Sequence, residues 1–242
     1  MVIDGLVNAI SNFILFGAVL ILRKSLSNEG LDAFLIHVDR KGLKLFCEGL
    51  IVGALLIGLY AVVVVLLGSG QFIYDGTRIL ESIIVIIANG IGFLGVALFE
   101  EALFRGYIFL KLLKKVPMII AAILSSLLFG MIHIFNYSSS PNMWVAIINA
   151  VLIGFLLCIL TIKSGSLMLP IGYHLAWNLT EKILLSEKGG MVHLFTPGGN
   201  TESEYLITAI LLVMSLYVFF RIRTFPKKAK HILQYADENP VN

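Results

Sequence analysis

Long apolar runs separated by short polar segments dominate this chain. Seven of these runs have about the 20 residues that a helix needs to cross a hydrocarbon core of about 30 Å. They lie at 6–22, 43–67, 80–110, 117–135, 143–162, 167–185 and 205–220. The third run is too long for one perpendicular span, so it tilts, breaks near Asn89 or continues past the bilayer surface. The pattern predicts an all-α, polytopic transmembrane bundle of about seven spans (six to eight).

Composition supports a membrane protein over a soluble one. Of the 242 residues, 58% are hydrophobic and 14% are charged, and the mean hydropathy is +0.94. This length suits one bundle, so 1–242 is predicted to be a single integral membrane domain. The net charge of +3 is small, and no nucleic-acid partner is expected. Cys47 and Cys158 lack Cys-x-x-Cys spacing, which argues against a disulfide framework or a thiolate metal site.

Basic residues are concentrated in alternate connecting segments. The segments after the first, third, fifth and seventh runs hold Arg23, Lys24, Arg40, Lys41, Lys44, Lys111, Lys114, Lys115, Lys163, Arg221, Arg223, Lys227, Lys228 and Lys230. Because basic loops tend to stay in the cytoplasm, we predict an N-terminus outside, a C-terminus inside and a basic cytoplasmic tail at 221–242. Residues 25–38 fit an interfacial helix or a plain connector, and 186–204 fit an irregular outer loop.

Burial in a membrane would cost the most free energy at the stretch Glu100-Glu101-Ala102-Leu103-Phe104-Arg105, which places three charges inside an apolar run. Each ionised residue near the middle of a membrane helix costs about 2.5 to 3.5 kcal/mol, so these residues must pair or face water. In a helix, Glu101 and Arg105 share one face and can neutralise each other. Glu100 points about 100° away and is left to act in the bundle interior.

Two further runs place histidine at membrane depth. Phe129 and His133 lie one helical turn apart, and so do His174 and Asn178. One shared hydrated cavity between the third, fourth and sixth helices would relieve the burial cost of all these groups. A purely stabilising polar cluster is the competing interpretation.

One glycine pattern needs separate treatment. Residues 90–95 read Gly-x-Gly-x-x-Gly, but no strand precedes them and no acidic residue follows at the required distance. We reject a dinucleotide site. Close approach between membrane helices explains this pattern better, and Gly49 and Gly53 are interpreted in the same way.

The three polar patterns together resemble the motifs of the CAAX protease and bacteriocin-processing family. They read Glu-Glu-x-x-x-Arg, Phe-x-x-x-His and His-x-x-x-Asn, in that order. This family includes the eukaryotic Ras-converting endopeptidase and many bacterial Abi proteins. The resemblance covers 80–185, which is therefore the predicted catalytic core, and no motif position departs from the family pattern.

The resemblance implies an intramembrane endopeptidase. By position, Glu100 and His133 would activate a water, and His174 and Asn178 would stabilise the oxyanion. Glu101, Arg105 and Phe129 would support them. Such water-based chemistry needs a base and oxyanion donors. The motifs contain no serine or cysteine, which argues against an acyl-enzyme.

The same residues are also compatible with three other functions. No cofactor is expected, but Glu100, His133 and His174 also form a possible zinc-ligand set, so a zinc-dependent version of the protease is an alternative. A non-catalytic immunity or scaffold protein would bind a peptide in the same cavity without cutting it. A transporter or proton relay would use the same groups as titrating sites.

The expected partners are a peptide or lipid-anchored protein substrate and membrane lipid. The short loops resemble the bacterial branch of the family, so we expect a bacterial cytoplasmic membrane protein. Counting about 1.5 Å per residue from the cytoplasmic helix ends puts His174 about 12 Å deep and His133 about 25 Å deep. Strong tilts or a re-entrant fourth helix must bring them together, and we expect access to the cavity from the cytoplasm.

Overall fold

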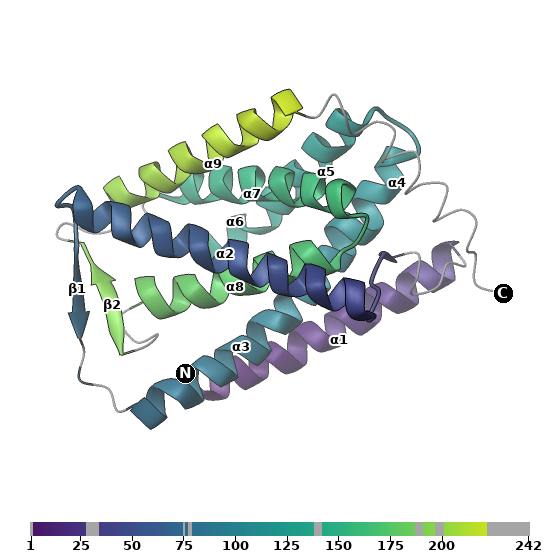
Figure 1. Cartoon of the computed structure of the whole chain (residues 1–242). Coiled ribbons are helices and arrows are strands. Elements are labelled where there is room, and N and C mark those ends of the chain that lie inside the picture. Colours follow the sequence, from purple (N-terminus) through teal and green to yellow (C-terminus); the bar gives the residue numbers. More distant parts are fainter. Residues whose placement is uncertain are drawn as a thin grey trace.

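The computed structural model describes residues 2–27, 34–74, 76, 79–137, 142–186, 191–196 and 201–221. In order, its elements are α1 (Val2–Ser27), α2 (Arg40–Leu66), β1 (Gln71–Tyr74), α3 (Ile79–Glu101), the π-helix η2 (Ala102–Phe109), α4 (Leu110–Leu113), α5 (Met118–Ile132), α6 (Ile134–Tyr137), α7 (Met143–Ser164), α8 (Met168–Leu185), β2 (Val192–Phe195) and α9 (Thr201–Arg221). The helices run side by side as one elongated bundle (Figure 1). The all-α bundle prediction is confirmed.

Each of the seven predicted apolar runs is helical. Five helical stretches among the described residues are long and apolar enough to cross a membrane: Gly5–Ser25, Arg40–Leu66, Ile79–Leu113, Met118–Asn136 and Met143–Ser164. The long third run neither breaks at Asn89 nor stops early, because α3, η2 and α4 follow one another from Ile79 to Leu113. The sixth run, α8, is not among the five because polar side chains interrupt its apolar sequence.

Glycines allow the central helix α8 to lie directly against α2. A Cβ atom on Gly49 would overlap the carbonyl oxygen of Leu169, and one on Gly172 would overlap that of Phe46. Gly92 belongs to the Gly-x-Gly-x-x-Gly stretch for which a dinucleotide site was rejected, and it allows α1 and α3 to approach closely. A Cβ atom on Gly92 would lie 3.0 Å from the carbonyl oxygen of Gly5. The interpretation of these glycines as helix contacts is confirmed.

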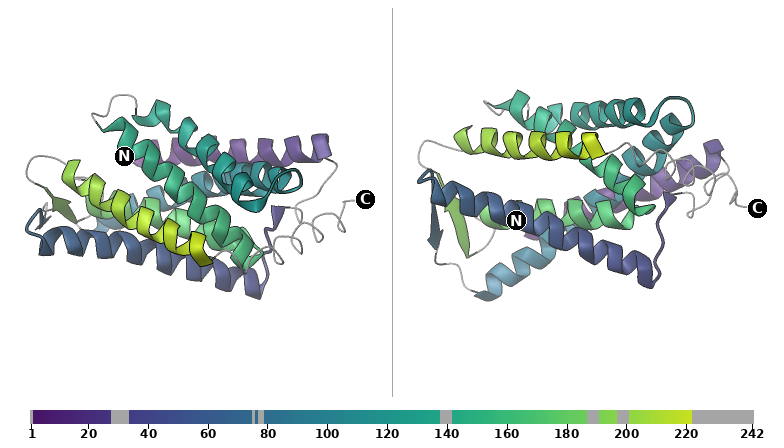
Figure 2. Two further views of the ribbon diagram at one scale, coloured as in Figure 1. Left: turned by 90° about the horizontal axis from the view of Figure 1, so that it is seen from above. Right: turned by 45° about the horizontal axis from the view of Figure 1, so that its top comes forward.

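Two short strands correct the prediction that 186–204 is irregular. β1 and β2 pair antiparallel, with Gln71 opposite Phe195 and Tyr74 opposite Val192. They join the connectors that follow α2 and α8, both of which were predicted to lie on the same side of the membrane. Figure 2 shows this pair at one end of the bundle, which we call the strand end.

The opposite end, which we call the basic end, comprises the connectors α1–α2, α4–α5 and α7–α8. There Phe34 and Leu35 are buried in the core. Leu35 also accepts hydrogen bonds from the backbone of Leu167 (2.9 Å) and the hydroxyl of Ser166 (3.2 Å). Residues 34 and 35 of the predicted interfacial helix or connector at 25–38 therefore pack into the bundle core at this end. Residues 28–33 and the tail from 222 onward lie outside the described residues.

Candidate active site

The predicted Glu101–Arg105 pair joins the last residue of α3 to the middle of η2. Both side chains are fully buried, and Arg105 Nη1 donates to Glu101 Oε1 over 2.8 Å. Arg105 Nη2 also donates to the carbonyl oxygen of Gly154 on α7 over 3.3 Å. The guanidinium lies 4.3 Å above the ring of Phe129, a cation–π contact that links α5 to the pair. The pair therefore ties three helices together.

Glu101 has a second partner that the sequence did not reveal. His174 Nδ1 on α8 lies 2.9 Å from the same Oε1 atom that Arg105 contacts. A carboxylate only accepts, so this bond places the proton on Nδ1 and directs Nε2 elsewhere. Nε2 lies 3.7 Å from Glu100 Oε2. Glu101 thus orients His174, while Glu100 faces its other nitrogen.

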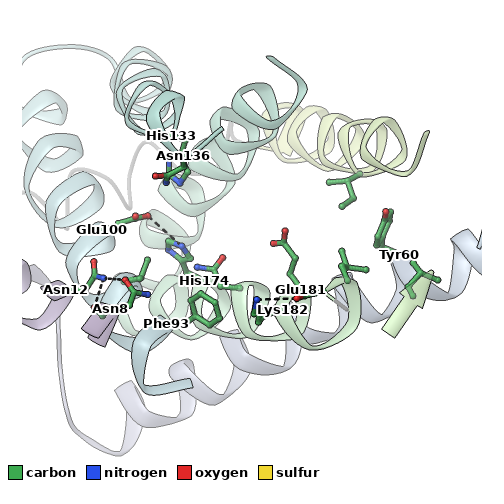
Figure 3. Close-up of a pocket in the computed structure, with 16 residues that line it drawn as sticks. Asn8, Asn12, Tyr60, Phe93, Glu100, His133, Asn136, His174, Glu181 and Lys182 are labelled. Atoms are coloured by element: carbon green, nitrogen blue, oxygen red, sulfur yellow. Dashed lines mark hydrogen bonds and ion pairs between the residues drawn. The ribbon is translucent and has the colours of Figure 1, made fainter. Parts of the chain in front are cut away.

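Glu100 differs sharply from its neighbour. Its side chain is 12% exposed, and its Oε2 receives no hydrogen bond from the residues that the structure describes. Figure 3 shows Glu100 and His174 facing each other at the cavity. The predicted division between a paired Glu101 and a Glu100 directed at the interior is what the geometry shows.

His133 occupies a turn between α5 and α6, so the predicted continuous fourth helix is interrupted at this residue. Its Nδ1 lies 2.8 Å from the carbonyl oxygen of Phe129. Because a carbonyl only accepts, Nδ1 carries the proton and the Nε2 of the neutral ring is an acceptor. The Phe129 ring lies 4.7 Å from the ring of His133 and 6.1 Å from that of His174, centroid to centroid. Phe129 thus contacts the rings of both histidines.

One cavity of about 630 Å³ brings Glu100, His133, His174 and Asn178 together. A second hollow of about 150 Å³ is lined by His133, His174 and Asn178 and also by Phe129. The side chains that the sequence placed on three different helices therefore share one polar space. Glu101 and Arg105 lie behind it and contact it through His174 and Phe129.

Several other polar side chains line the larger cavity, and sequence reasoning missed them. They are Asn8 and Asn12 on α1, Asn136 on α6, and Glu181, Lys182 and Ser186 at the end of α8. Helical spacing was the available signal, because Glu181 and Lys182 follow Asn178 by three and four residues. The same spacing relates Asn8 to Asn12, whose amide donates to Asn8 Oδ1 over 2.7 Å.

Glu100, His133 and His174 are the residues that the sequence suggested as a possible zinc-ligand set. Among the described residues, no group of three or more His, Cys, Asp or Glu side chains is arranged to hold a metal ion. Glu100, His133 and His174 line one cavity, yet they do not form a ready three-ligand site.

The comparisons with known proteins agree with this site. Residues 78–180 match the family model described as type II CAAX prenyl endopeptidase Rce1-like. The uncharacterized protein YyaK of Bacillus subtilis (strain 168) is 33% identical over 124 residues, covering 48% of this chain and 41% of that protein. The chain thus spans less than half the length of this curated relative. No solved structure gives a significant match.

The family match contains all three motifs, from Glu100 to Asn178. The resemblance to the CAAX protease family is confirmed by this match. The five long apolar helices place the chain among integral membrane proteins.

Proposed function

We propose that this protein is an intramembrane endopeptidase that hydrolyses a peptide bond near the membrane surface with an activated water. The observation that carries the proposal is the cavity in which Glu100, His133, His174 and Asn178 meet. A peptide carbonyl resists water unless a base removes a proton and donors meet the charge that develops on oxygen. This cavity offers candidates for both tasks.

In the proposed reaction, Glu100 and the Nε2 of His133 hold the water, and Glu100 takes its proton as the water oxygen attacks the carbonyl carbon. The amide of Asn178 and the Nε2 proton of His174 stabilise the oxyanion. Glu100 then returns the proton to the leaving nitrogen as the C–N bond breaks. In this donor role the His174 ring carries a proton on both nitrogens, and its Nδ1 donates to Glu101 Oε1 over 2.9 Å.

The proposed substrate is a peptide or a lipid-anchored protein in a bacterial cytoplasmic membrane. The family description names prenyl endopeptidases, and a prenylated C-terminus is one possible substrate of that kind. The proposed orientation has the N-terminus outside and the C-terminus inside. This orientation places the basic end, where the described Lys and Arg residues cluster, in the cytoplasm, as expected for basic loops.

The test uses purified protein in lipid nanodiscs with a peptide library and mass spectrometry. Glu100→Gln and His133→Ala should each lower the cleavage rate by about 10²- to 10⁴-fold, because each removes proton-transfer machinery. Glu81→Gln, an exposed glutamate on the same helix α3, is the matched control and should cleave normally. Wild-type activity in folded Glu100→Gln would refute the proposal.

The competing functions give different results. A peptide-binding immunity or scaffold protein would bind library peptides without products, and its phenotype would survive Glu100→Gln. A transporter would give proton or solute flux into liposomes. In the zinc-dependent version a chelator abolishes cleavage and added zinc restores it, whereas the proposed mechanism predicts unchanged cleavage after chelation.

A further inference from the structure

The cavity extends along the long axis of the bundle. Starting from His174, its lining follows α8 through Asn178 and Lys182 to Ser186 and continues to Leu194 on β2. Figure 3 shows Glu181 and Lys182 extending from His174 toward Tyr60, which lies in the half of α2 next to β1. The cavity therefore runs from the catalytic groups toward the strand end.

The opposite side of the catalytic groups is filled with apolar side chains. On α8, Ile171 lies one turn before His174 and is 1% exposed, and Leu167 at the start of the helix is 0% exposed. They belong to one buried core that also contains Phe34, Leu35, Phe109, Leu110, Leu113 and Ile162. We call this core the plug, and it separates the site from the basic end.

Arg23 reinforces the plug at its outer edge. Its guanidinium lies 4.3 Å from the centroid of the Phe34 ring and is buried, and Nη1 donates to the carbonyl oxygen of Gly106. A buried arginine paired in this way is costly to displace. The basic end is thus closed by packing and by a charge-assisted hydrogen bond.

Charge identifies which membrane face each end occupies. Nine Lys and Arg residues that the structure describes lie at or near the basic end: Arg23, Lys24, Arg40, Lys41, Lys44, Lys111, Lys114, Lys115 and Lys163. In the connectors and helix ends of the strand end, Lys182 is the one Lys or Arg among the described residues, and the sequence adds Arg78 and Lys188 to the segments that follow β1 and α8. Such a bias holds the basic end in the cytoplasm.

We infer that the catalytic cavity opens to the extracytoplasmic face of the membrane, contrary to the access expected from sequence. This inference rests on the proposed endopeptidase function and specifies its substrate class. The substrate is an extended polypeptide segment that reaches the outer face, either translocated across the membrane or next to the span of an outward-facing domain. Within the substrates proposed above, this inference sets aside proteins anchored on the cytoplasmic leaflet, including a prenylated C-terminus on that side, because their peptide bond would lie at the closed end.

The experiment measures side-specific thiol labelling of the full-length protein in intact cells. The background variant is Cys47→Ser, because Cys47 is exposed whereas Cys158 is buried. Glu181→Cys and Ser186→Cys report on the cavity, and Lys115→Cys, an exposed position at the basic end, reports on the opposite face. None of these positions belongs to the proposed catalytic machinery.

A membrane-impermeant maleimide should label both cavity reporters in intact cells, with no increase after permeabilisation. Lys115→Cys should rise from background only after permeabilisation. The reversed pattern would overturn the inference, because the cavity would then face the cytoplasm. Cavity reporters that remain unlabelled in permeabilised cells would also overturn it, because the cavity would then be closed.

A second measurement separates this inference from the proposed function. Library peptides are added to right-side-out and inverted membrane vesicles that contain the unmodified protein. Cleavage only in right-side-out vesicles supports the inference, and cleavage only in inverted vesicles refutes it while leaving the protease function intact. Failure to cleave in either preparation counts against the proposed function, and the labelling result stands independently of it.

Discussion

The two ends of this bundle are built on opposite principles. Toward the basic end, apolar side chains fill the space between helices, and residues such as Leu167 and Phe109 are completely buried. Toward the strand end the same helices enclose a cavity lined with amides, carboxylates and histidine. The comparison shows that one half of the bundle is filled by packed apolar side chains and that the other half encloses a polar cavity.

The two adjacent glutamates mark the boundary between these halves. Glu101 has a guanidinium and an imidazole on one oxygen, whereas Glu100 meets the cavity. Substitutions on the packed side should therefore change stability, and substitutions on the cavity side should change rate.

The largest effect is expected from Arg105→Ala. It leaves the fully buried Glu101 without its guanidinium, and breaking a buried pair in this way costs about 3 to 5 kcal/mol of unfolding free energy. The measurement is the denaturant dependence of unfolding in mixed micelles. Lys44→Ala is the matched control, because it breaks an exposed pair of the same spacing (Lys44–Glu48, 3.9 Å). That control should change stability by less than about 1 kcal/mol, and equal losses in both variants would contradict the division.

Asn178→Ala tests the cavity side. Removing an oxyanion donor lowers kcat by about 10²- to 10³-fold, or about 2.7 to 4 kcal/mol. Unfolding should be nearly unchanged, because the side chain borders the cavity and is only partly buried. Peptide cleavage and unfolding are measured on the same preparation. A loss of stability with normal kcat would assign Asn178 to packing.

Gly172→Ala tests the contact between α2 and α8. Its Cβ would overlap the backbone of Phe46, and overpacking of this kind costs about 1 to 3 kcal/mol. Gly58→Ala on α2 is the control, because nothing lies within 4 Å of its added Cβ. Alanine there should stabilise the helix by about 0.5 to 1 kcal/mol. Thermal unfolding monitored by circular dichroism separates the two, and stabilisation by both substitutions would show that α2 and α8 are less closely packed.

Ser186→Ala should have the smallest effect. Lys182 Nζ donates to its hydroxyl over 3.2 Å at the far end of the cavity, an arrangement that could activate a serine nucleophile. Water activated by Glu100 needs no such residue, so cleavage should continue at the wild-type rate. Loss of cleavage with retained folding would replace the water mechanism with an acyl-enzyme.

Much of the architecture follows directly from the chain. Apolar length predicted the helices, and the cost of burying charge singled out Glu100, Glu101 and Arg105 before any contact was known. Small residues predicted the close helix contacts at Gly49 and Gly53. These features depend on local composition and periodicity, which a single sequence contains.

Contacts between distant segments required the tertiary structure. The bond between Glu101 and His174 joins residues 73 positions apart, and helical spacing contains no information about such pairs. The pairing of β1 with β2 was missed because each strand has only four residues. Depth counting gave no account of the packing around the site, because the distance to a helix end does not show whether side chains fill the space.

The sequence by itself determined a helical membrane protein, its charge asymmetry and the residue types of its reactive site, since hydrophobic length and the cost of buried charge act locally. Only the tertiary structure decided which partner orients His174 and which end of the bundle is closed. These depend on the packing of helices far apart in the chain, where one plug of apolar side chains fills one side of the site and leaves the other open.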